Sequence, residues 1–144
     1  MQISSRFTIA VHVLICIETF KNDYKVTSDF LASSVNVNPV VIRRLLQQLK
    51  KAGLINVKRG SGGTDIEKPL NEITLLDLYH AVECVEDGNL FHFHESPNQL
   101  CPVGKNIHSL LDVRLEEIQK AMEKEMMSVS IQDIMNDAKE LIQM

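Results

Sequence analysis

The sequence predicts a mainly α-helical chain with one small β-hairpin, and three observations lead to this prediction. Apolar residues recur at intervals of three and four over residues 4–20, 39–52 and 103–127, the period of a helix with a buried side. LINVK (54–58) and TDI (64–66) flank the glycine-rich turn RGSGG, which is typical of a hairpin. The 144 residues, 44% of them hydrophobic, suffice for one compact domain with an attached oligomerisation element.

Cysteine usage and the lack of a membrane-length segment predict a cytoplasmic protein with no membrane partner. The three cysteines are an odd number without disulfide-framework spacing, which is typical of a reducing compartment. The apolar run 6–17 is interrupted by Thr8 and His12 and followed by Glu18, so we interpret it as a buried first helix rather than a signal sequence. No stretch approaches the ~20 apolar residues that span a bilayer.

Charge is divided unevenly between the two halves of the chain. Residues 1–70 contain ten Lys or Arg and five Asp or Glu, whereas residues 71–144 contain five and fourteen; the net charges of +5 and −9 add to −4. The segment 43–59 holds six of the basic residues and no acid. Such a density of positive charge is suited to a polyanion, although a solvated helix face would show the same run.

Two neighbouring segments predict a short helix, a tight turn and a second helix. VTSDFLASSV begins with an N-cap at Thr27 or Ser28 and is ended by NVNP. Asn38 is a good N-cap and Pro39 suits the first helical position, so the second helix begins there and ends at Gly53.

The second helix is predicted to be amphipathic, and the hairpin follows it directly. Helical spacing assigns to its buried side Val41, Ile42, Leu45, Leu46, Leu49 and Ala52. The opposite side carries Val40, Arg43, Arg44 and Gln47. A helix-turn-helix with a basic second helix is suited to the major groove of double-stranded DNA. The hairpin, with Arg59 at its root, is suited to the minor groove, so the pattern is that of a winged helix-turn-helix domain.

The second half of the chain predicts a long loop and a long helix. Thr74 with Asp77 three residues on is a capping-box-like helix start, and residues 85–102 lack periodicity. About 24 helical residues after 102 form a rod of about 36 Å, too long for so small a core to cover. We therefore expect a dimerisation helix that pairs with its copy in a homodimer. The expected seam consists of Ile107, Leu111, Leu115, Ile118, Met122 and Met126.

In this order the motifs resemble those of the Rrf family of winged-helix regulators, the group that includes IscR, NsrR and CymR. The matching segments are ISSRFTIAVHVL, LKKAGLINVKRGSGG, EITLLDLYHAVE and CPVG. The resemblance implies a sequence-specific, homodimeric transcriptional repressor similar to members without an iron–sulfur cluster. It implies a DNA-binding domain in 1–84, an effector-type loop in 85–102, and a dimerisation helix with a C-terminal helix in 103–144.

The resemblance also implies which residues contact DNA. Phosphate contacts are implied for Ser4, Ser5, Arg6, Thr27 and Ser28. Contacts from the recognition helix and the wing are implied for Asn38, Val40, Val41, Arg43, Arg44, Arg59, Ser61, Gly62 and Gly63. For Val41 this differs from the helical spacing, which places it on the buried side. The chain departs from the family pattern at Thr64, Asp65 and Ile66, where Asp65 brings an acid to the wing.

The loop raises the question of a metal or redox site. Cluster-binding relatives carry three cysteines about six residues apart in this loop. Here only Cys101 matches, while Glu95 and Asn89 stand at the other two intervals, so no iron–sulfur cluster or other cofactor is expected. Two alternatives stay open: a metal ion on His92, His94 and Cys101, and Cys101 as a redox-sensing thiol at a helix start.

A second class of function is a winged-helix module for protein contacts, or a metal or thiol sensor that does not itself bind DNA. Enzymatic activity is not expected, because no nucleophile, base and orienting acid can be placed together. DNA binding with steep salt dependence, lost on Arg43→Ala or Arg59→Ala, would distinguish the regulator from the protein-contact module.

Overall fold

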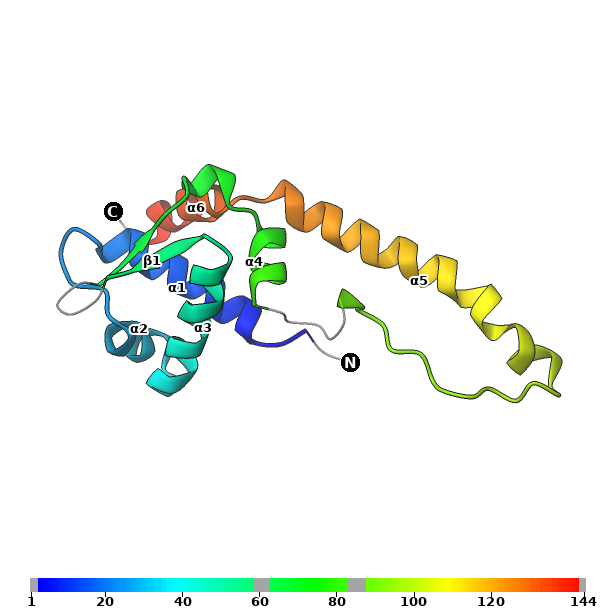
Figure 1. Cartoon of the computed structure of the whole chain (residues 1–144). Helices are drawn as coiled ribbons and strands as arrows, with labels where there is room; N and C mark the ends of the chain where they lie inside the picture. Colours follow the sequence, from blue (N-terminus) through cyan, green and yellow to red (C-terminus); the bar gives the residue numbers. More distant parts are fainter. Residues whose placement is uncertain (1–2, 59–62, 83–87, 143–144) are drawn as a thin grey trace.

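The computed structural model describes residues 3–58, 63–82 and 88–142, and it consists of a helical N-terminal domain and a projecting arm (Figure 1). The elements in chain order are α1 (Arg6–Phe20), α2 (Ser28–Val35), α3 (Pro39–Lys51), β1 (Ile55–Val57), β2 (Thr64–Ile66), η1 (Leu70–Glu72), α4 (Leu75–Ala81), α5 (Pro102–Ser128) and α6 (Ile131–Ile142). The predicted mainly α fold with a small hairpin is confirmed.

α1 is the central helix of the domain, in contact with α2, β2, α4 and α6. It is apolar on several sides because it is covered from several directions, and Ala10, Val13, Leu14 and Ile17 are completely buried. The prediction that this apolar segment is a buried helix is confirmed. The helix begins at Arg6, two residues later than expected.

α2 and α3 begin at caps that the sequence predicts. Thr27 Oγ1 accepts a hydrogen bond from Phe30 N at 3.1 Å, and Asn38 Oδ1 accepts one from Val40 N at 2.9 Å. Asn36, which follows α2, has a φ of 64°, the left-handed conformation in which many helices end, and its N–H donates to Ala32 O at 2.8 Å. These local contacts fix the angle at which α3 leaves the turn.

The hairpin is held to the rest of the domain at its return strand. β1 and β2 pair antiparallel, with Ile55 opposite Ile66. Thr64 N donates to Val26 O at 2.9 Å, just before α2. A Cβ atom on Gly63 would lie 2.8 Å from Val26 N and 3.0 Å from Val26 O, so this close approach requires glycine. The hairpin therefore has a fixed position relative to α2 and α3.

α4 begins with the predicted capping box. Thr74 Oγ1 accepts from Asp77 N at 3.1 Å, and Asp77 Oδ2 accepts from Thr74 N at 2.9 Å. The helix ends at Ala81 rather than at about Cys84, and Cys84 lies outside the described residues.

α6 packs against the N-terminal domain. Ile131 N donates to Ile73 O at 2.8 Å, and Ile131 and Met135 are buried in the same core as α1. The sequence groups this helix with the preceding long one in 103–144. Its packing instead places α6 in the same core as α1–α4.

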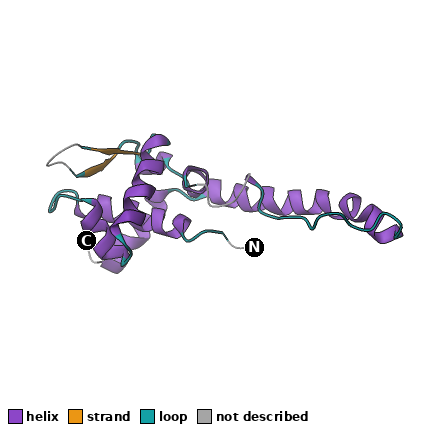
Figure 2. Ribbon diagram, turned by 60° about the horizontal axis from the view of Figure 1, so that its bottom comes forward, coloured by secondary structure: helices purple, strands orange, loops and turns teal. Residues whose placement is uncertain are grey.

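α5 forms the arm, and residues 88–101 run back along it in both views (Figures 1 and 2). Its 27 residues make a helix of about 40 Å, longer than the expected segment by one residue at each end. No residue of this fully described helix is buried. No helix among the described residues is long and apolar enough to cross a membrane.

Candidate nucleic-acid interface

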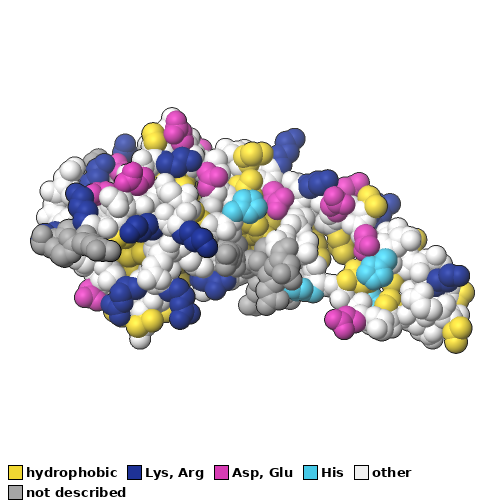
Figure 3. Space-filling model, in the orientation of Figure 1, with side chains coloured by type: hydrophobic (Ala, Val, Ile, Leu, Met, Phe, Trp, Pro, Cys, Tyr) yellow, Lys and Arg dark blue, Asp and Glu magenta, His cyan; other side chains and the backbone are white. Residues whose placement is uncertain are grey.

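Basic side chains gather over α2 and α3 on the face seen in Figure 3. Arg43, Arg44, Lys50 and Lys51 are all exposed on α3, which contains no Asp or Glu. Lys50 and Lys51 lie in its last turn, where their positive charges interact favourably with the negative end of the helix dipole. The helix thus presents positive charge without a competing acid of its own.

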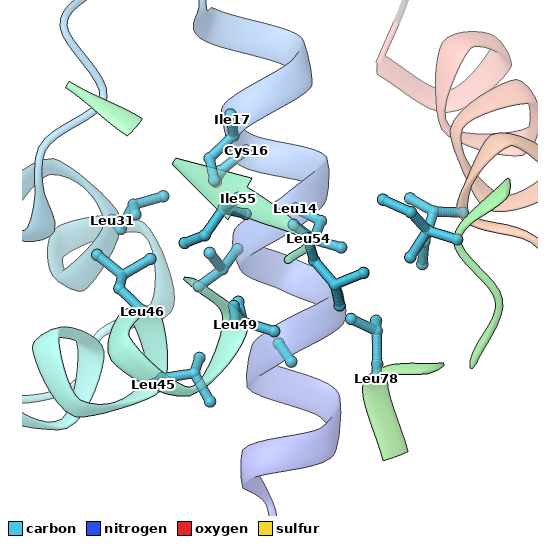
Figure 4. Close-up of a cluster of buried hydrophobic side chains, with 14 of the residues drawn as sticks. Leu14, Cys16, Ile17, Leu31, Leu45, Leu46, Leu49, Leu54, Ile55 and Leu78 are labelled. Atoms are coloured by element: carbon cyan, nitrogen blue, oxygen red, sulfur yellow. The ribbon is translucent and has the colours of Figure 1, made fainter. Parts of the chain in front are cut away.

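The basic side of α3 faces outward because its apolar side is held in the core. Ile42, Leu45, Leu46 and Leu49 are buried as predicted. Figure 4 shows the three leucines in one cluster with Leu14 and Ile17 of α1. Burying four such side chains, at roughly 1.5–3 kcal/mol each, is ample to fix the rotation of α3 about its own axis.

The placement of Val41 and Ala52 on the buried side of α3 is wrong. Val41 is 40% exposed and neighbouring Val40 is 52% exposed, and Ala52 is exposed as well. Both valines lie in the first turn, and Ala52 is the C-cap, so these positions lie at the ends of the helix beyond the packed leucines. Helical spacing shows which residues share one side of a helix. It does not show how far along that side the neighbouring helices extend.

A cleft of about 440 Å³ lies between α3, the start of α2 and the hairpin. It is lined by Thr27, Ser28, Arg43, Leu46, Gln47, Lys50, Val57, Gly63 and Thr64. The cleft brings together four residues of the predicted DNA-contact set: Thr27, Ser28, Arg43 and Gly63. Gln47 and Lys50 were not in that set, although the position of Gln47 on the basic side of α3 was a usable signal.

The remaining predicted contact residues are distributed around this cleft. Asn38, Val40, Val41 and Arg44 are exposed at the beginning of α3. Ser4, Ser5 and Arg6 lie at the start of α1 and do not line the cleft; Ser4 Oγ accepts from Arg6 N at 3.2 Å. Arg59, Ser61 and Gly62 lie outside the described residues. The wing acid Asp65 is paired with Lys58 at 3.0 Å, so much of its negative charge is compensated.

The loop 88–101 does not bring the proposed metal ligands together. Among the described residues, no three His, Cys, Asp or Glu side chains are arranged to hold a metal ion, so His92, His94 and Cys101 do not form a site. The ring of Phe93 stacks instead on His108 of α5, with ring centroids 3.8 Å apart, and on His94 at 4.8 Å.

Cys101 is an exposed thiol immediately before α5. Hydrogen bonds from the backbone amides of Gly104 and Val103 stabilise its thiolate and hold the pKa of this thiol below its ordinary value. The expected position of Cys101 at a helix start is confirmed, and this environment favours reaction with oxidants and electrophiles.

The residues of the predicted dimer seam on α5 differ in how far their own chain covers them. Met122 and Met126 pack against the chain's own core, and Leu115 is half-buried beside the loop. Leu111 and Ile118 are exposed, and Ile107 is half-buried. The exposed apolar residues Val103, Leu110 and Val113 were not in the predicted seam.

Comparisons with known proteins give a consistent result. A family profile described as Rrf2, an iron-dependent transcriptional regulator, matches residues 3–137. YwnA of Bacillus subtilis (strain 168), which is named as an HTH-type transcriptional regulator, is 44% identical over 134 residues, 93% of this chain and 97% of YwnA. A crystal structure described as that of a DNA binding protein has 37% identity and a TM-score of 0.70, covering 91% of this chain and 99% of that one.

The fold is shared with more distant proteins. The structure of IscR from T. potens has a TM-score of 0.71 at 19% identity and covers 98% of this chain and 90% of its own. At that identity the likeness concerns the fold alone.

The described residues do not fit an iron–sulfur cluster, the group suggested by the iron in the family's description. Such clusters are held mainly by cysteine thiolates. Within 88–101 the thiol donors amount to Cys101, and Glu95 and Asn89 occupy the positions six and twelve residues before it. No three potential metal ligands converge in the described part of the chain.

Proposed function

Because the chain belongs to the Rrf2 family of transcriptional regulators, we propose that it is a homodimeric repressor that places α3 in the major groove of its operator and the hairpin in the adjacent minor groove. The observation on which this rests is the cleft between α3, the start of α2 and the hairpin. A strand of the DNA backbone can follow this cleft while the elements on either side enter the two grooves.

The residues of the cleft supply what a phosphate group requires. Arg43 and Lys50 contribute positive charge from α3, and Thr27 and Ser28 contribute hydroxyl groups at the N-terminal end of α2. Helix N-termini favour anions because their amides and dipole point toward them. We therefore assign to the cleft the contacts that set the position of the protein on DNA.

The first turn of α3 is assigned to base recognition. Val40 and Val41 expose apolar surface at the end of α3 that leads into the groove, where they can contact thymine methyl groups. Arg44 is exposed next to them and can donate two hydrogen bonds to a guanine, worth about 1–3 kcal/mol of discrimination. Phosphate contacts and base contacts thus come from different parts of one helix.

The arm is assigned to dimerisation. Leu110, Leu111 and Ile118 of α5 are 59%, 37% and 52% exposed, so the described part of the chain leaves much of this apolar surface uncovered. Pairing two arms would remove this apolar surface from water at about 25 cal/mol per Å². A dimer joined in this way has two α3 helices, one for each half-site of an operator. Repression then follows from occupying promoter DNA, which excludes polymerase.

DNA binding is tested by fluorescence anisotropy with DNA from upstream of the protein's own gene and with random DNA, at several salt concentrations. The logarithm of the affinity should fall with the logarithm of the salt concentration, with a slope near −0.9 per phosphate contact. Arg43→Ala should weaken binding at least about tenfold, whereas Lys124→Ala, an exposed lysine on the arm, should not. Equal effects of the two variants would support the protein-contact function instead.

Repression is tested by in vitro transcription from the same DNA. The transcript should decrease as protein is added, and Arg43→Ala should need more protein for the same effect. An increase in transcript would show an activator.

A further inference from the structure

A second cleft, remote from α3, lies between the loop 88–101 and α5. Its volume is about 500 Å³, within the range of roughly 300–1,000 Å³ of small-molecule sites. The loop contributes the rings of Phe91 and Phe93, and α5 contributes the carboxylates of Asp112, Glu116 and Glu123. Aromatic rings therefore face a row of acids across the cleft.

Specific contacts hold the loop at both ends of this cleft. At one end the Gln119 side chain accepts from Leu90 N at 3.0 Å and donates to Gly88 O at 2.7 Å. At the other end Gly104 in the first turn of α5 lies against Asn98, so that a Cβ atom there would be 3.1 Å from Asn98 N and closer still to Asn98 O. The cleft is thus defined by the packing of the loop on the helix.

The electrostatic environment of the cleft favours a cation. Three lining carboxylates and Lys120 leave a net charge of −2 when His108 is neutral. Lys120 lies 3.0 Å from Glu116, whose hydrogen bond and charge raise the pKa of this lysine above its ordinary value. Glu123 accepts a hydrogen bond at 3.3 Å from the neutral amide of Gln119. Asp112 in turn lies 3.2 Å from His108 Nδ1, so each of the three carboxylates has a polar neighbour within the chain. The net charge of −2 nevertheless repels an anion and attracts a cation.

We propose that this cleft binds a small organic cation, an ammonium or amidinium group on an apolar or aromatic body. The carboxylates of α5 would surround the charge, and the ring of Phe91 would pack against the body and attract the cation. Phe93, which stacks on His108 and His94, forms part of the wall of the cleft. A bare metal ion is a poorer occupant, because no three metal ligands converge among the described residues.

Ligand binding and arm pairing use different sides of α5. At about 100° per residue, Ile118 lies about 160° around the helix from Glu116, and Leu110 about the same angle from Asp112. Both events can therefore occur on the same arm. The cleft would be the effector site of the regulator proposed above, so its regulatory role rests on that function, whereas ligand binding itself does not.

The test is titration of the full-length protein with benzamidine, followed by calorimetry and by backbone amide shifts in NMR spectra. Benzoate, which has the same ring and the opposite charge, is the control. Benzamidine should bind one site per chain and shift the amides of Phe91, Phe93 and Gln119, and benzoate should not bind.

Variants locate the site. Glu116→Gln combined with Glu123→Gln should weaken benzamidine binding at least about tenfold, because charge-assisted hydrogen bonds are lost. Glu117→Gln combined with Glu125→Gln removes the same charge from exposed positions of α5 outside the cleft and should leave binding unchanged. Equal binding of benzoate, equal weakening by both pairs, or no saturable binding of benzamidine would overturn the proposal.

Operator affinity with and without benzamidine separates the two proposals. A change in affinity with the ligand bound supports the effector role. If benzamidine binds without changing operator affinity, the effector role is overturned and the proposed binding site for an organic cation still stands. Failure to bind operator DNA would overturn the proposed function, with the benzamidine result unaffected.

Discussion

α3 and α5 are both helices that begin with proline and carry apolar residues along one side, yet the protein uses them in opposite ways. α3 buries four residues in the core of its own chain, and its polar side is the exposed one. α5 buries none of its residues and exposes apolar side chains near its middle. A helix whose apolar side is buried exposes its charged side, which is then available for recognition. A helix whose apolar side is exposed is stabilised when another chain covers that side.

The charges of the two helices follow the same division. α3 has four basic residues and no acid, whereas α5 contains five acids. α5 also carries four basic residues, so its net charge is −1 with His108 neutral, whereas that of α3 is +4. Positive charge without nearby acids is suited to phosphate. The difference is consistent with the proposal that α3 binds DNA and α5 binds other partners.

The largest expected effect is on the core beneath α3. Leu49 is completely buried, so Leu49→Ala should lower the free energy of unfolding by about 2–5 kcal/mol, measured by urea denaturation followed by circular dichroism. Leu110→Ala on α5 is the matched control and should cost less than about 0.5 kcal/mol at protein concentrations where the chain is monomeric. Similar costs would contradict the contrast between the helices.

The next effect concerns the arm. Ile118→Asp places a charge in the proposed dimer interface and should raise the dimer dissociation constant at least about 100-fold, because an unpaired carboxylate would be removed from water. Sedimentation velocity measures the change. Ser109→Asp adds the same charge to an exposed position on another side of α5 and should leave the dimer intact. A dimer that tolerates Ile118→Asp would exclude this interface.

The hairpin should respond to a single methyl group. Gly63→Ala brings a Cβ atom against the Val26 backbone and should lower the free energy of unfolding by about 1–3 kcal/mol. Displacing the hairpin should also weaken operator binding in the anisotropy assay. Asn56→Ala, at an exposed position of β1, should do neither. Unchanged stability of Gly63→Ala would show that the hairpin can move freely from Val26.

The smallest expected effect is on the reactivity of Cys101. Its thiolate is favoured by the amides of Gly104 and Val103, and a lowered pKa means that more thiolate is present at neutral pH than in a free cysteine. The rate of alkylation by iodoacetamide, followed at this residue by mass spectrometry, should therefore rise at lower pH than for free cysteine. Buried Cys16 should react more slowly.

A redox role for Cys101 is a further step. If it senses oxidants, peroxide should release operator DNA from the protein, and Cys101→Ser should prevent this release. Release that is the same in both proteins would contradict a sensing role.

Much of the fold could be predicted because its signals are local. Asn38 and Pro39 start α3, and the pair Thr74 and Asp77 starts α4, through contacts that span three residues or fewer. The basic segment 43–59 likewise needs no tertiary structure to be noticed. These signals predicted the helix-turn-helix and the direction of its basic side.

The rest depended on contacts between distant parts of the chain. Val41 was misplaced because the spacing along α3 does not show where the core ends. Met122 and Met126 belong to the same apolar period as Ile118, yet they face the chain's own core. Gly63 was expected as a DNA contact, and the structure adds a second reason for glycine in the approach of Val26.

The sequence by itself determined the helices, their caps, the hairpin and the separation of charge. The helices, caps and hairpin depend on residues that are near one another in the chain, and the charge separation depends on composition alone. Tertiary structure alone decided that α6 completes the N-terminal core, that α5 leaves one apolar side uncovered, and that the loop 88–101 lines a cleft of acids and aromatic rings. Whether a side chain is buried depends on which elements, distant in the sequence, pack against it. The periodicity of one segment does not show which elements these are.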